Sequence, residues 1–585
     1  MPDLVVPADV SQAPVQVGRS RITSNSNKGL LMKRASVTVL TILAASAVVA
    51  AQSGEAVSAS SATSVGSAVT ARPAPGKIKL TLLSAGARSW FKAPATGATA
   101  SAAGGAAARS ARIAFGTNVD AADPNEDLAA GQSETAIAAA GSTVVTAWND
   151  ISGFLVQPST DQRASTTGLG VSTDGGRHFR DLVGLRNNRP NQQWFGDPSV
   201  VAVDPHTFLI GSLYLPATVL NCSPGHQAHL QLAVEVLSLG ASGAASLGLP
   251  VVTADGGDVC PLVNSAQPPP NIGMLDKDWL SYDKHTRTLA MSYTRFFFGF
   301  GGQSGSGQIE VVRAHLPADP RTLTAHNWSA PITVWPEELN VSNQGAYVSV
   351  SSTGDAYLAW ERNLQSNVFN GNPFVFIQAA RVRAGDRTPT VGGPAFPRVV
   401  SLGQRNSNGA GGVKSFDAVA IAGYNRGTGQ DMPRIAVDGP LGKVIVAWND
   451  ASAHPLGDIW MRALPLDLAV GGAITKVNDD NSYALHFLPA LSIRGDGAIV
   501  TSWYDRRLTG PDSARTDYFG EVRSTPTRNA TDFRITSGST DWSNTSAVTA
   551  PNFGDYTDNA STGNKTYFTW SDGRIGVPQP FVDSR

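Results

Sequence analysis

Seven copies of one short pattern run along the chain. In each copy, a short apolar strand is followed by a polar turn with Gly or Asp, and then by a second apolar strand that ends in an aromatic residue. The copies lie at about 134–150, 197–215, 278–296, 345–363, 432–450, 488–507 and 555–574, and their aromatics are Trp148, Tyr214, Tyr293, Trp360, Trp448, Trp503 and Trp570. A spacing of roughly 55–90 residues is the length of one four-stranded unit with its loops.

The repeat predicts an all-β fold, a seven-bladed β-propeller of four-stranded antiparallel blades. Radial repetition protects most strand edges and creates one shared axis. Six blades are the alternative, with the second or third copy as an insertion, because its second strand ends in Tyr rather than Trp. The C-terminal residues PFVDSR supply only a third strand. We therefore expect the orphan segment 111–119 to add the fourth strand of the last blade and close the ring.

The composition agrees with a β protein that is rich in turns. Of 585 residues, 59 are Gly and 36 are Pro, and only 16% are charged. The formal net charge is -1, so the chain lacks the basic footprint of a nucleic-acid-binding protein. Nucleic acid is therefore not an expected partner.

The N-terminal part predicts export. Lys33 and Arg34 precede an apolar run at 37–51 that is followed by small residues, which indicates a signal peptide at 32–51. The run is short for a membrane span; an uncleaved anchor is the alternative. Residues 1–31 form a polar upstream segment, with Met32 as an alternative start, and 52–110 form an Ala/Ser/Gly-rich linker. This leaves the propeller at 111–585, secreted and monomeric, with no membrane span after cleavage.

The two cysteines, Cys222 and Cys260, both lie in the second copy of the repeat. In an oxidising compartment we expect a disulfide between them that closes an insertion of roughly 40 residues; two separate buried thiols are the alternative. No cofactor is predicted except a structural calcium ion, for which the side chains available are those of Asp123, Asn125, Glu126 and Asp127.

The most specific local motif is the turn at 172–179, with Ser172, Asp174, Gly176 and Phe179 at its defining positions. It matches the Asp box, Ser/Thr-x-Asp-x-Gly-x-x-Trp/Phe. The Asp accepts hydrogen bonds from turn amides, the Gly adopts a conformation that other residues avoid, and the aromatic fixes the turn to its sheet. With the Trp-x-Asp strand ends, this motif resembles the sialidase (neuraminidase) superfamily of β-propellers over 111–585. In that family the Asp box is structural.

Blade topology places many charged residues on one face. If strands A to D run outward from the axis, the residues before each A strand and after each B strand share a face and lie nearest the axis. Those before A strands are Glu126, Glu134, Asp197, Asp276, Asp278 and Asp555; those after B strands are Asp150, Arg295, Glu361, Arg362, Asp450, Asp505, Arg506, Arg507, Asp572 and Arg574. We expect a polar ligand to bind on this face.

Not all of these residues are expected to function. The acid two residues after the aromatic recurs in several blades, which is typical of a turn cap, because chemistry requires an asymmetric site. The exceptions to the repeat are therefore the candidates. They include the two Phe-Gly-Asp copies at 195–197 and 553–555, and the lone His486 is expected to be structural. The aromatic run 296–300 is either a blade core or an exposed stacking surface.

The resemblance implies a carbohydrate-active enzyme, a glycoside hydrolase of exo-sialidase type. Such an enzyme holds the sugar carboxylate with arginines and uses a Tyr nucleophile with an acidic acid/base. The predicted catalytic residues are Asp197, Asp505, Asp555, Tyr556 and Glu361, with Tyr504 as a further phenol; the predicted substrate-binding residues are Arg295, Arg362, Arg506, Arg507 and Arg574. Arg434 lies in an A strand and is expected to face a neighbouring strand.

The alternative is a non-catalytic extracellular propeller that binds a glycan or a protein through the same face. The enzyme predicts two carboxyl groups in an asymmetric site, or a Tyr–Glu pair. The binding module predicts that every acid on the face is tied to backbone or to an arginine.

Overall fold

The structure is a computed structural model. It describes 117–123, 131–155, 161–190, 192–216, 229–258, 273–297, 306–338, 341–364, 374–386, 398–404, 432–438, 442–450, 453, 456–469, 471–510, 513–545 and 554–585. Within these residues the chain forms β-strands and short 3-10 turns and no α-helix. None of the described segments is a helix that could cross a membrane.

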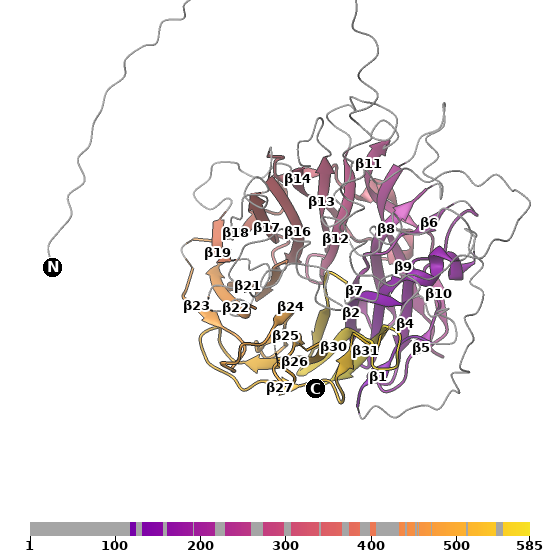
Figure 1. Cartoon of the computed structure of the whole chain (residues 1–585). Helices are drawn as coiled ribbons and strands as arrows, with labels where there is room; N and C mark the ends of the chain where they lie inside the picture. The colour runs from indigo at the N-terminus through magenta and orange to yellow at the C-terminus, as the bar shows by residue number, and fades with distance from the viewer. Residues whose placement is uncertain are drawn as a thin grey trace, which may run out of the picture. The chain divides into compact units, whose positions relative to one another are not determined.

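Seven antiparallel sheets surround a common axis and form a seven-bladed β-propeller (Figure 1). Blade I contains β2 (Gln132–Ala140), β3 (Thr143–Asp150), β4 (Thr167–Ser172) and β5 (Arg180–Asp181). Blade II contains β6 (Gln193–Trp194), β7 (Ser199–Asp204), β8 (Thr207–Leu215), β9 (His229–Leu239), β10 (Ala245–Leu247) and β11 (Val251–Asp258). Its six strands fill four positions, because β6 and β7 both pair with β8 while β10 and β11 both pair with β9.

The next blades have the simple four-strand order. Blade III contains β12 (Met274–Asp283), β13 (Thr288–Phe297), β14 (Ser306–His315) and β15 (Ile332–Trp335). Blade IV contains β16 (Val341–Val350), β17 (Ala356–Leu364), β18 (Phe374–Val382) and β19 (Arg398–Gln404). Blade V contains β20 (Arg434–Asp438), β21 (Lys443–Asp450), β22 (Asp458–Pro465) and β23 (Ile474–Lys476).

The last two blades complete the ring. Blade VI contains β24 (His486–Ile493), β25 (Ile499–Asp505), β26 (Arg515–Arg523), β27 (Phe533–Arg534) and the short β28 (Thr540–Asp541). Blade VII contains β29 (Asp558–Thr562), β30 (Lys565–Asp572), β31 (Gln579–Ser584) and β1 (Val119–Asp120). The inner strands contact one another in the order β2, β7, β12, β16, β20, β24, β29 and back to β2, so the ring is closed.

The predicted closure by an N-terminal strand is confirmed. β1 pairs with β31, with Val119 opposite Val582 and Asp120 opposite Phe581. The strand occupies the end of the predicted segment 111–119 and the residue after it. Asn118 strengthens this closure because its amide donates to the Ile535 carbonyl of blade VI.

The prediction of seven rather than six blades is also confirmed, with one correction in blade II. In blade I the β2–β3 ladder is interrupted after Ser133, and Ala136 then pairs with Ala147. The residue that follows Ala147 is Trp148. In blade II the corresponding pair is Ser199 with Gly211, so Ser212 and not Tyr214 occupies the aromatic position. Tyr214 instead lies two residues further on, where its ring packs against Trp194 at 5.1 Å between ring centres.

The turn at 172–179 joins β4 to β5, the third and fourth strands of blade I. Asp174 Oδ1 accepts hydrogen bonds from the backbone amides of Arg177 (3.0 Å) and His178 (3.1 Å). Gly176 has a φ of +82°, which favours glycine. Phe179 packs against the cluster that contains Tyr567 of blade VII. The turn therefore links the first blade to the last.

Several predictions fall on residues outside the described part of the chain. These are the segments 1–110, the cysteines Cys222 and Cys260, and the possible calcium ligands Asn125, Glu126 and Asp127. The fourth of these ligands, Asp123, is described, and its backbone amide donates to Asp181 at 2.7 Å. No group of three or more His, Cys, Asp or Glu side chains among the described residues is arranged to hold a metal ion.

Candidate functional site

The candidate site lies at the end of the axis where the inner strands begin. Here the ladders of blades I and III are irregular, between Ser133 and Ala136 and between Asp276 and Trp279. The left-handed backbone conformation occurs at the irregularities of blades I and III, in Glu134 (φ 53°) and Lys277 (φ 59°). It also occurs between β6 and β7, in Asp197 (φ 55°). Such backbone costs about 1–3 kcal/mol per residue and is concentrated at functional sites. The irregularities bring charged side chains of three blades together.

Glu134 is the centre of a hydrogen-bond network. Its Oε1 accepts from the backbone amide of Asp555 at 2.8 Å, and its Oε2 accepts from the Asn149 amide at 2.5 Å. The Asn149 Oδ1 in turn accepts from the backbone amide of Asp197 at 2.6 Å. One carboxylate and one amide thus connect blades I, II and VII, and the two donors stabilise the charged form of Glu134.

Both glycines of the Phe-Gly-Asp copies are required by this network. A Cβ on Gly554 would lie 2.2 Å from Cγ of Glu134, and a Cβ on Gly196 would lie 2.7 Å from Oδ1 of Asn149. Both glycines also have positive φ, +82° and +89°. The sequence thus has Gly before each Asp because the backbone must approach the side chains of Glu134 and Asn149.

Asp197 is the least satisfied member of the site. Its side chain is fully buried, no N–H group of the described residues donates to its carboxyl oxygens, and its hydrogen-bonding partner is the Glu134 carboxyl group. Burial raises the pKa of Asp197 well above its usual range; the charges of Glu134 and Asp276 add to the increase, and Lys277 opposes it. The neutral form of Asp197 is therefore favoured beside the Glu134 carboxyl group.

The third blade contributes Asp276, Lys277 and Asp278, all buried. The Asp278 carboxyl group interacts with the Ser199 hydroxyl group and with its own backbone amide. Burial and the charge of Asp276 raise the pKa of Asp278 well above its usual range. Lys277 forms a buried ion pair with Asp555, which joins blade III to blade VII.

We define the axial cluster as Glu134, Asp197, Asp276, Lys277, Asp278 and Asp555. All six side chains are at most 4% exposed. Carboxyl groups outnumber the one ammonium group, so the cluster can be accommodated only with some carboxyls protonated. Tyr556 lies next to it, and two of the predicted catalytic residues, Asp197 and Asp555, both belong to it.

Tyr556 does not have the surroundings of an activated phenol. Its hydroxyl donates to the Pro198 carbonyl at 2.9 Å. Burial raises the pKa of Tyr556 well above its usual range, and the charges of Asp197 and Glu134 increase it further. The neutral phenol is therefore favoured. The ring packs edge-on against Trp279, 5.8 Å between ring centres.

Arg434 binds the inner strands to one another. Its guanidinium lies over the rings of Tyr347 (3.7 Å), Trp279 (4.7 Å) and Tyr556 (5.6 Å). It also donates to the backbone carbonyls of Pro489, at 3.1 Å, and Thr557. This buried residue of blade V therefore contacts blades III, IV, VI and VII, in agreement with the expectation that it faces a neighbouring strand.

The Trp-x-Asp-x-Arg strand ends have the same local structure in blades VI and VII. Trp503 Nε1 and Arg507 Nε both donate to Asp505 Oδ2, each at 2.8 Å. Trp570 Nε1 and Arg574 Nε donate to Asp572 Oδ2 at 2.8 and 2.9 Å. The repetition supports the structural role expected of recurring acids. These contacts engage three of the predicted site residues, Asp505, Arg507 and Arg574, with partners in their own blades.

The other predicted arginines are also paired locally. Arg295 is bound to Glu310 at 3.0 Å, and Arg362 is bound to Glu338. Arg506 donates to the Thr516 hydroxyl (3.0 Å) and the Ser513 carbonyl (2.9 Å). Glu361 is buried and accepts from the Gln344 amide at 2.5 Å. Tyr504 donates to the Ser571 carbonyl at 3.0 Å.

His486 belongs to a second polar cluster, between blades V and VI. Its Nε2 lies 3.1 Å from Asp480 Oδ1 and 3.5 Å from Asp505 Oδ2, and its Nδ1 lies 3.0 Å from the Gly457 carbonyl. The charge of Asp505 and the hydrogen bond with Asp480 raise the pKa of His486 despite burial. Every ring nitrogen of His486 is occupied, which fits the structural role expected of it.

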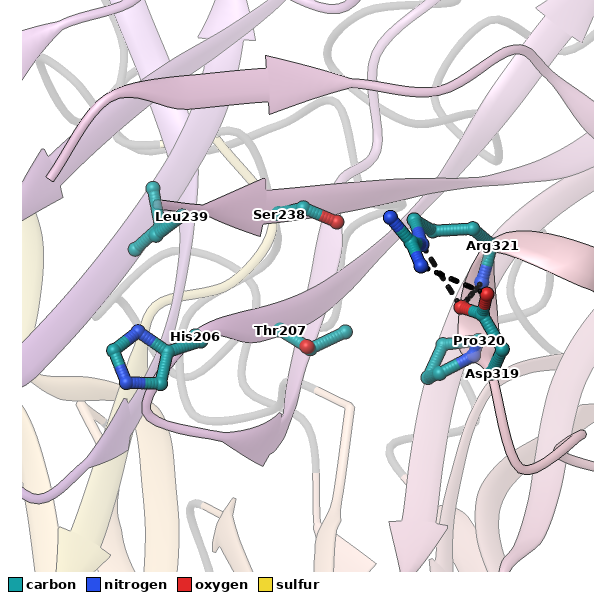
Figure 2. Close-up of a pocket in the computed structure, with 7 residues that line it drawn as sticks. All are labelled: His206, Thr207, Ser238, Leu239, Asp319, Pro320 and Arg321. Carbon is teal, nitrogen blue, oxygen red and sulfur yellow. Dashed lines mark hydrogen bonds and ion pairs between the residues drawn. The ribbon is translucent and has the colours of Figure 1, made fainter. Parts of the chain in front are cut away.

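A hollow of about 240 Å³ lies on the opposite face, at the β7–β8 turn. Figure 2 shows its lining, which includes His206, Thr207 and Ser238 of blade II and Asp319 and Arg321 of blade III. Arg321 and Asp319 are bound to each other at 2.9 Å and are largely exposed. This hollow has no contact with the axial cluster, which lies where β7 begins and β8 ends.

The site contains residues that the sequence did not single out as catalytic. The sequence places Glu134 only among the acids before A strands, and it predicts no role for Asn149 or Lys277. The only signal for Asn149 is a polar residue directly after Trp148 at the end of β3, and Asn449 follows Trp448 in the same way. The signal for Lys277 is its place between two acids, Asp276 and Asp278, in the sequence.

Comparison with known proteins gives structural likeness only. No protein-family model matches the chain, and no curated protein matches it. Among solved structures, the Trypanosoma rangeli sialidase is similar at 11% identity and a TM-score of 0.34, with 70% of this chain covered. The chain spans about 56% of the length of that sialidase.

Two further similar solved structures are an arabinofuranosidase and an arabinanase. The GH93 α-L-arabinofuranosidase of Fusarium graminearum has 11% identity and a TM-score of 0.38, with 66% of this chain and 91% of that chain covered. The α-L-arabinanase of Penicillium chrysogenum has 10% identity and a TM-score of 0.36, with 80% and 97% covered. Likenesses of this degree do not assign an activity.

Proposed function

We propose that this chain is an exported glycoside hydrolase whose chemistry takes place at the axial cluster. The observation that carries the proposal is Asp197, a fully buried carboxyl group that no N–H group of the described residues reaches, in contact with the hydrogen-bonded carboxylate of Glu134. Glycoside hydrolysis requires an acid that protonates the leaving oxygen and a second carboxylate. In these environments Asp197 favours its neutral form and Glu134 its charged form, which is what an acid and its carboxylate partner require.

The roles follow from the contacts. Asp197 would give its proton to the glycosidic oxygen as the bond to the sugar breaks. Glu134, fixed by Asn149 and by the amide of Asp555, would act as the ionised partner, either activating water or attacking the sugar carbon. Tyr556 would position Asp197 through the Pro198 carbonyl rather than attack, because its phenol is held neutral.

The finer proposal, an exo-sialidase, has less support. It requires arginines that are available to a sugar carboxylate. Four of the five predicted arginines are paired with a carboxylate in their own blade or the adjoining loop, and Arg506 is bound to Thr516 and Ser513. The alternative, a non-catalytic glycan- or protein-binding propeller, requires every acid on the face to be bound to backbone or to an arginine. The Asp197 side chain, which accepts from no N–H group of the described residues, favours the enzyme.

The test is hydrolysis of a panel of fluorogenic glycosides, including sialosides, uronides, arabinosides and hexosides, by the full chain. We expect turnover on at least one sugar and a loss of at least about 100-fold in kcat for Asp197→Asn, the effect of removing a general acid. Asp319→Asn, on the opposite face, is the matched control and should retain full activity. An active Asp197→Asn protein would refute the assignment, and an inactive wild type on all sugars would favour the binding module.

A further inference from the structure

We propose that an exposed surface of blade VI binds a further sugar unit of a polysaccharide, by stacking of the sugar ring on Tyr483. The surface consists of Asp479, Asn481 and Tyr483 before β24 and of Leu508 after β25, and we call it the Tyr483 platform. It is separate from the axial cluster, and the inference rests on the proposed function only for the class of the ligand, a glycan.

The Tyr483 platform lies on the same face of the propeller as the axial cluster. Tyr483 stands three residues before β24, the inner strand of blade VI, and Leu508 stands three residues after β25 ends. The Arg506 amide donates to the Leu485 carbonyl at 3.1 Å, which continues the β24–β25 ladder beyond the two strands. The two segments therefore leave blade VI side by side, at the end of the axis where the inner strands begin.

The platform presents apolar surface to solvent. Tyr483 is 66% exposed and Leu508 is 55% exposed, the two highest values among the large hydrophobic side chains that the structure describes. Single exposed apolar residues are ordinary, but these two lie on adjoining segments of one face. Two side chains are far less than the roughly 800 Å² per partner that a stable protein interface buries. The surface therefore suits a small ring better than a protein partner.

Polar groups alternate with the aromatic ring along the first segment. Asp479, Asn481 and Tyr483 are exposed, whereas Asp480 and Ser482 between them are half-buried and hydrogen-bonded to each other. An aromatic ring offers its face to the C–H groups of a sugar. The hydroxyl groups of that sugar can donate to a carboxylate and exchange hydrogen bonds with an amide. Ring, carboxylate and amide together are the groups that a sugar unit requires.

The first segment of the platform is fixed from its inner side. Asp480 accepts from the Asn478 amide at 2.8 Å and lies 3.1 Å from Nε2 of His486. Asp479 and Asp532 each donate a backbone amide to the carboxylate of the other, at 2.9 and 3.1 Å. The alternation thus directs one set of side chains to the protein and the other set to solvent.

The second segment is fixed by its own turn. The Gly510 amide donates to the Arg506 carbonyl at 3.0 Å, and the Thr509 hydroxyl donates to the Arg515 carbonyl at 2.9 Å. A surface that is fixed before binding loses little conformational entropy when the ligand arrives. A tyrosine ring on such a support can therefore contribute measurable affinity through few contacts.

The experiment measures polysaccharide binding by the full chain, using affinity electrophoresis in native gels. The gels contain xylan, arabinan, galactan, glucomannan or mixed-linkage β-glucan over a range of concentrations. At least one polysaccharide should retard the wild type, and Tyr483→Ala should weaken that interaction by about three- to tenfold. Tyr483→Phe keeps the ring and should bind within about twofold of the wild type. Leu249→Ala, a similarly exposed residue on the outer edge of blade II, is the matched control and should bind as the wild type does.

The outcomes separate this inference from the proposed function. Tyr483→Ala decides if its urea midpoint equals that of the wild type, and otherwise Asn481→Ala, which removes the exposed amide, decides. Undiminished binding by the deciding variant, equal losses in Tyr483→Phe and Tyr483→Ala, or no retardation of the wild type in any gel would overturn the inference. Weakened binding by a protein that hydrolyses no glycoside would support the inference and overturn only the proposed function.

Discussion

Arg434 offers the sharpest test of how the blades are held together. Replacement by Met keeps a long apolar side chain and removes the charge and the donors. The variant loses two hydrogen bonds from a charged donor, to the carbonyls of Pro489 and Thr557, worth about 1.5–3 kcal/mol each. It also loses cation–π contacts with Tyr347 and Trp279, worth up to about 2 kcal/mol when desolvated.

These gross contributions are opposed by the cost of burying the guanidinium in the first place. A net loss of about 3–5 kcal/mol is therefore expected, as for the breaking of other buried charged networks. Asp558 would also lose the nearby positive charge that lowers its pKa. Arg434→Lys should recover only part of the loss, because an ammonium group cannot donate in two fixed directions and lie flat on a ring at once.

The assay is urea unfolding of the full chain, followed by tryptophan fluorescence, with the transition midpoint and slope fitted together. Arg321→Met is the control, because Arg321 is exposed and its pair with Asp319 is on the surface; no measurable change is expected there. A midpoint for Arg434→Met equal to that of the wild type would refute the reasoning. A changed slope would mean that the blades no longer unfold together.

Three further predictions concern pH, the site backbone and the ring closure. Burial raises the pKa of Asp558 to about 7, above its value in the unfolded chain, so its contribution to stability is present in acid and is lost as pH rises towards 7. Asp558→Asn should flatten the decline in the free energy of unfolding between pH 4 and pH 7 by up to about 1.4 kcal/mol per pH unit. Gly554→Ala should abolish hydrolysis with only moderate loss of stability, because its Cβ would displace Glu134; unchanged kcat would contradict the network. Asn118→Ala should destabilise the closure by about 1–3 kcal/mol and expose the N-terminal strand to proteolysis, and a wild-type cleavage rate would argue against it.

The fold was predictable because its signal is repeated. The seven second strands occupy the segments that the sequence indicated, and the order of strands in blade I is the predicted one. The misplacement of Tyr214 has a physical reason. In blade II the four residues 195–198 between β6 and β7 lie opposite only two residues of β8, and Ser212 rather than an aromatic residue follows the first regular pair.

The site was predictable only in part, because hydrogen-bond partners are not encoded in spacing. Asp197 and Asp555 could be proposed from the glycines before them. The arginines after the second strands could not be separated from structural ones by sequence, because Asp505 with Arg507 and Asp572 with Arg574 look like a charged ligand site and form the same intrablade contacts. The importance of Glu134 depends on a positive φ and on two donors from other segments.

The position of a bound sugar tests the central claim most directly. The measurement is a crystal structure of the Asp197→Asn protein with the glycoside that the wild type cleaves fastest. The account predicts that the glycosidic oxygen lies within hydrogen-bonding distance of residue 197, with Glu134 facing the sugar carbon. A sugar bound in the hollow beside His206 and Arg321, or at any place away from the axis, would contradict it.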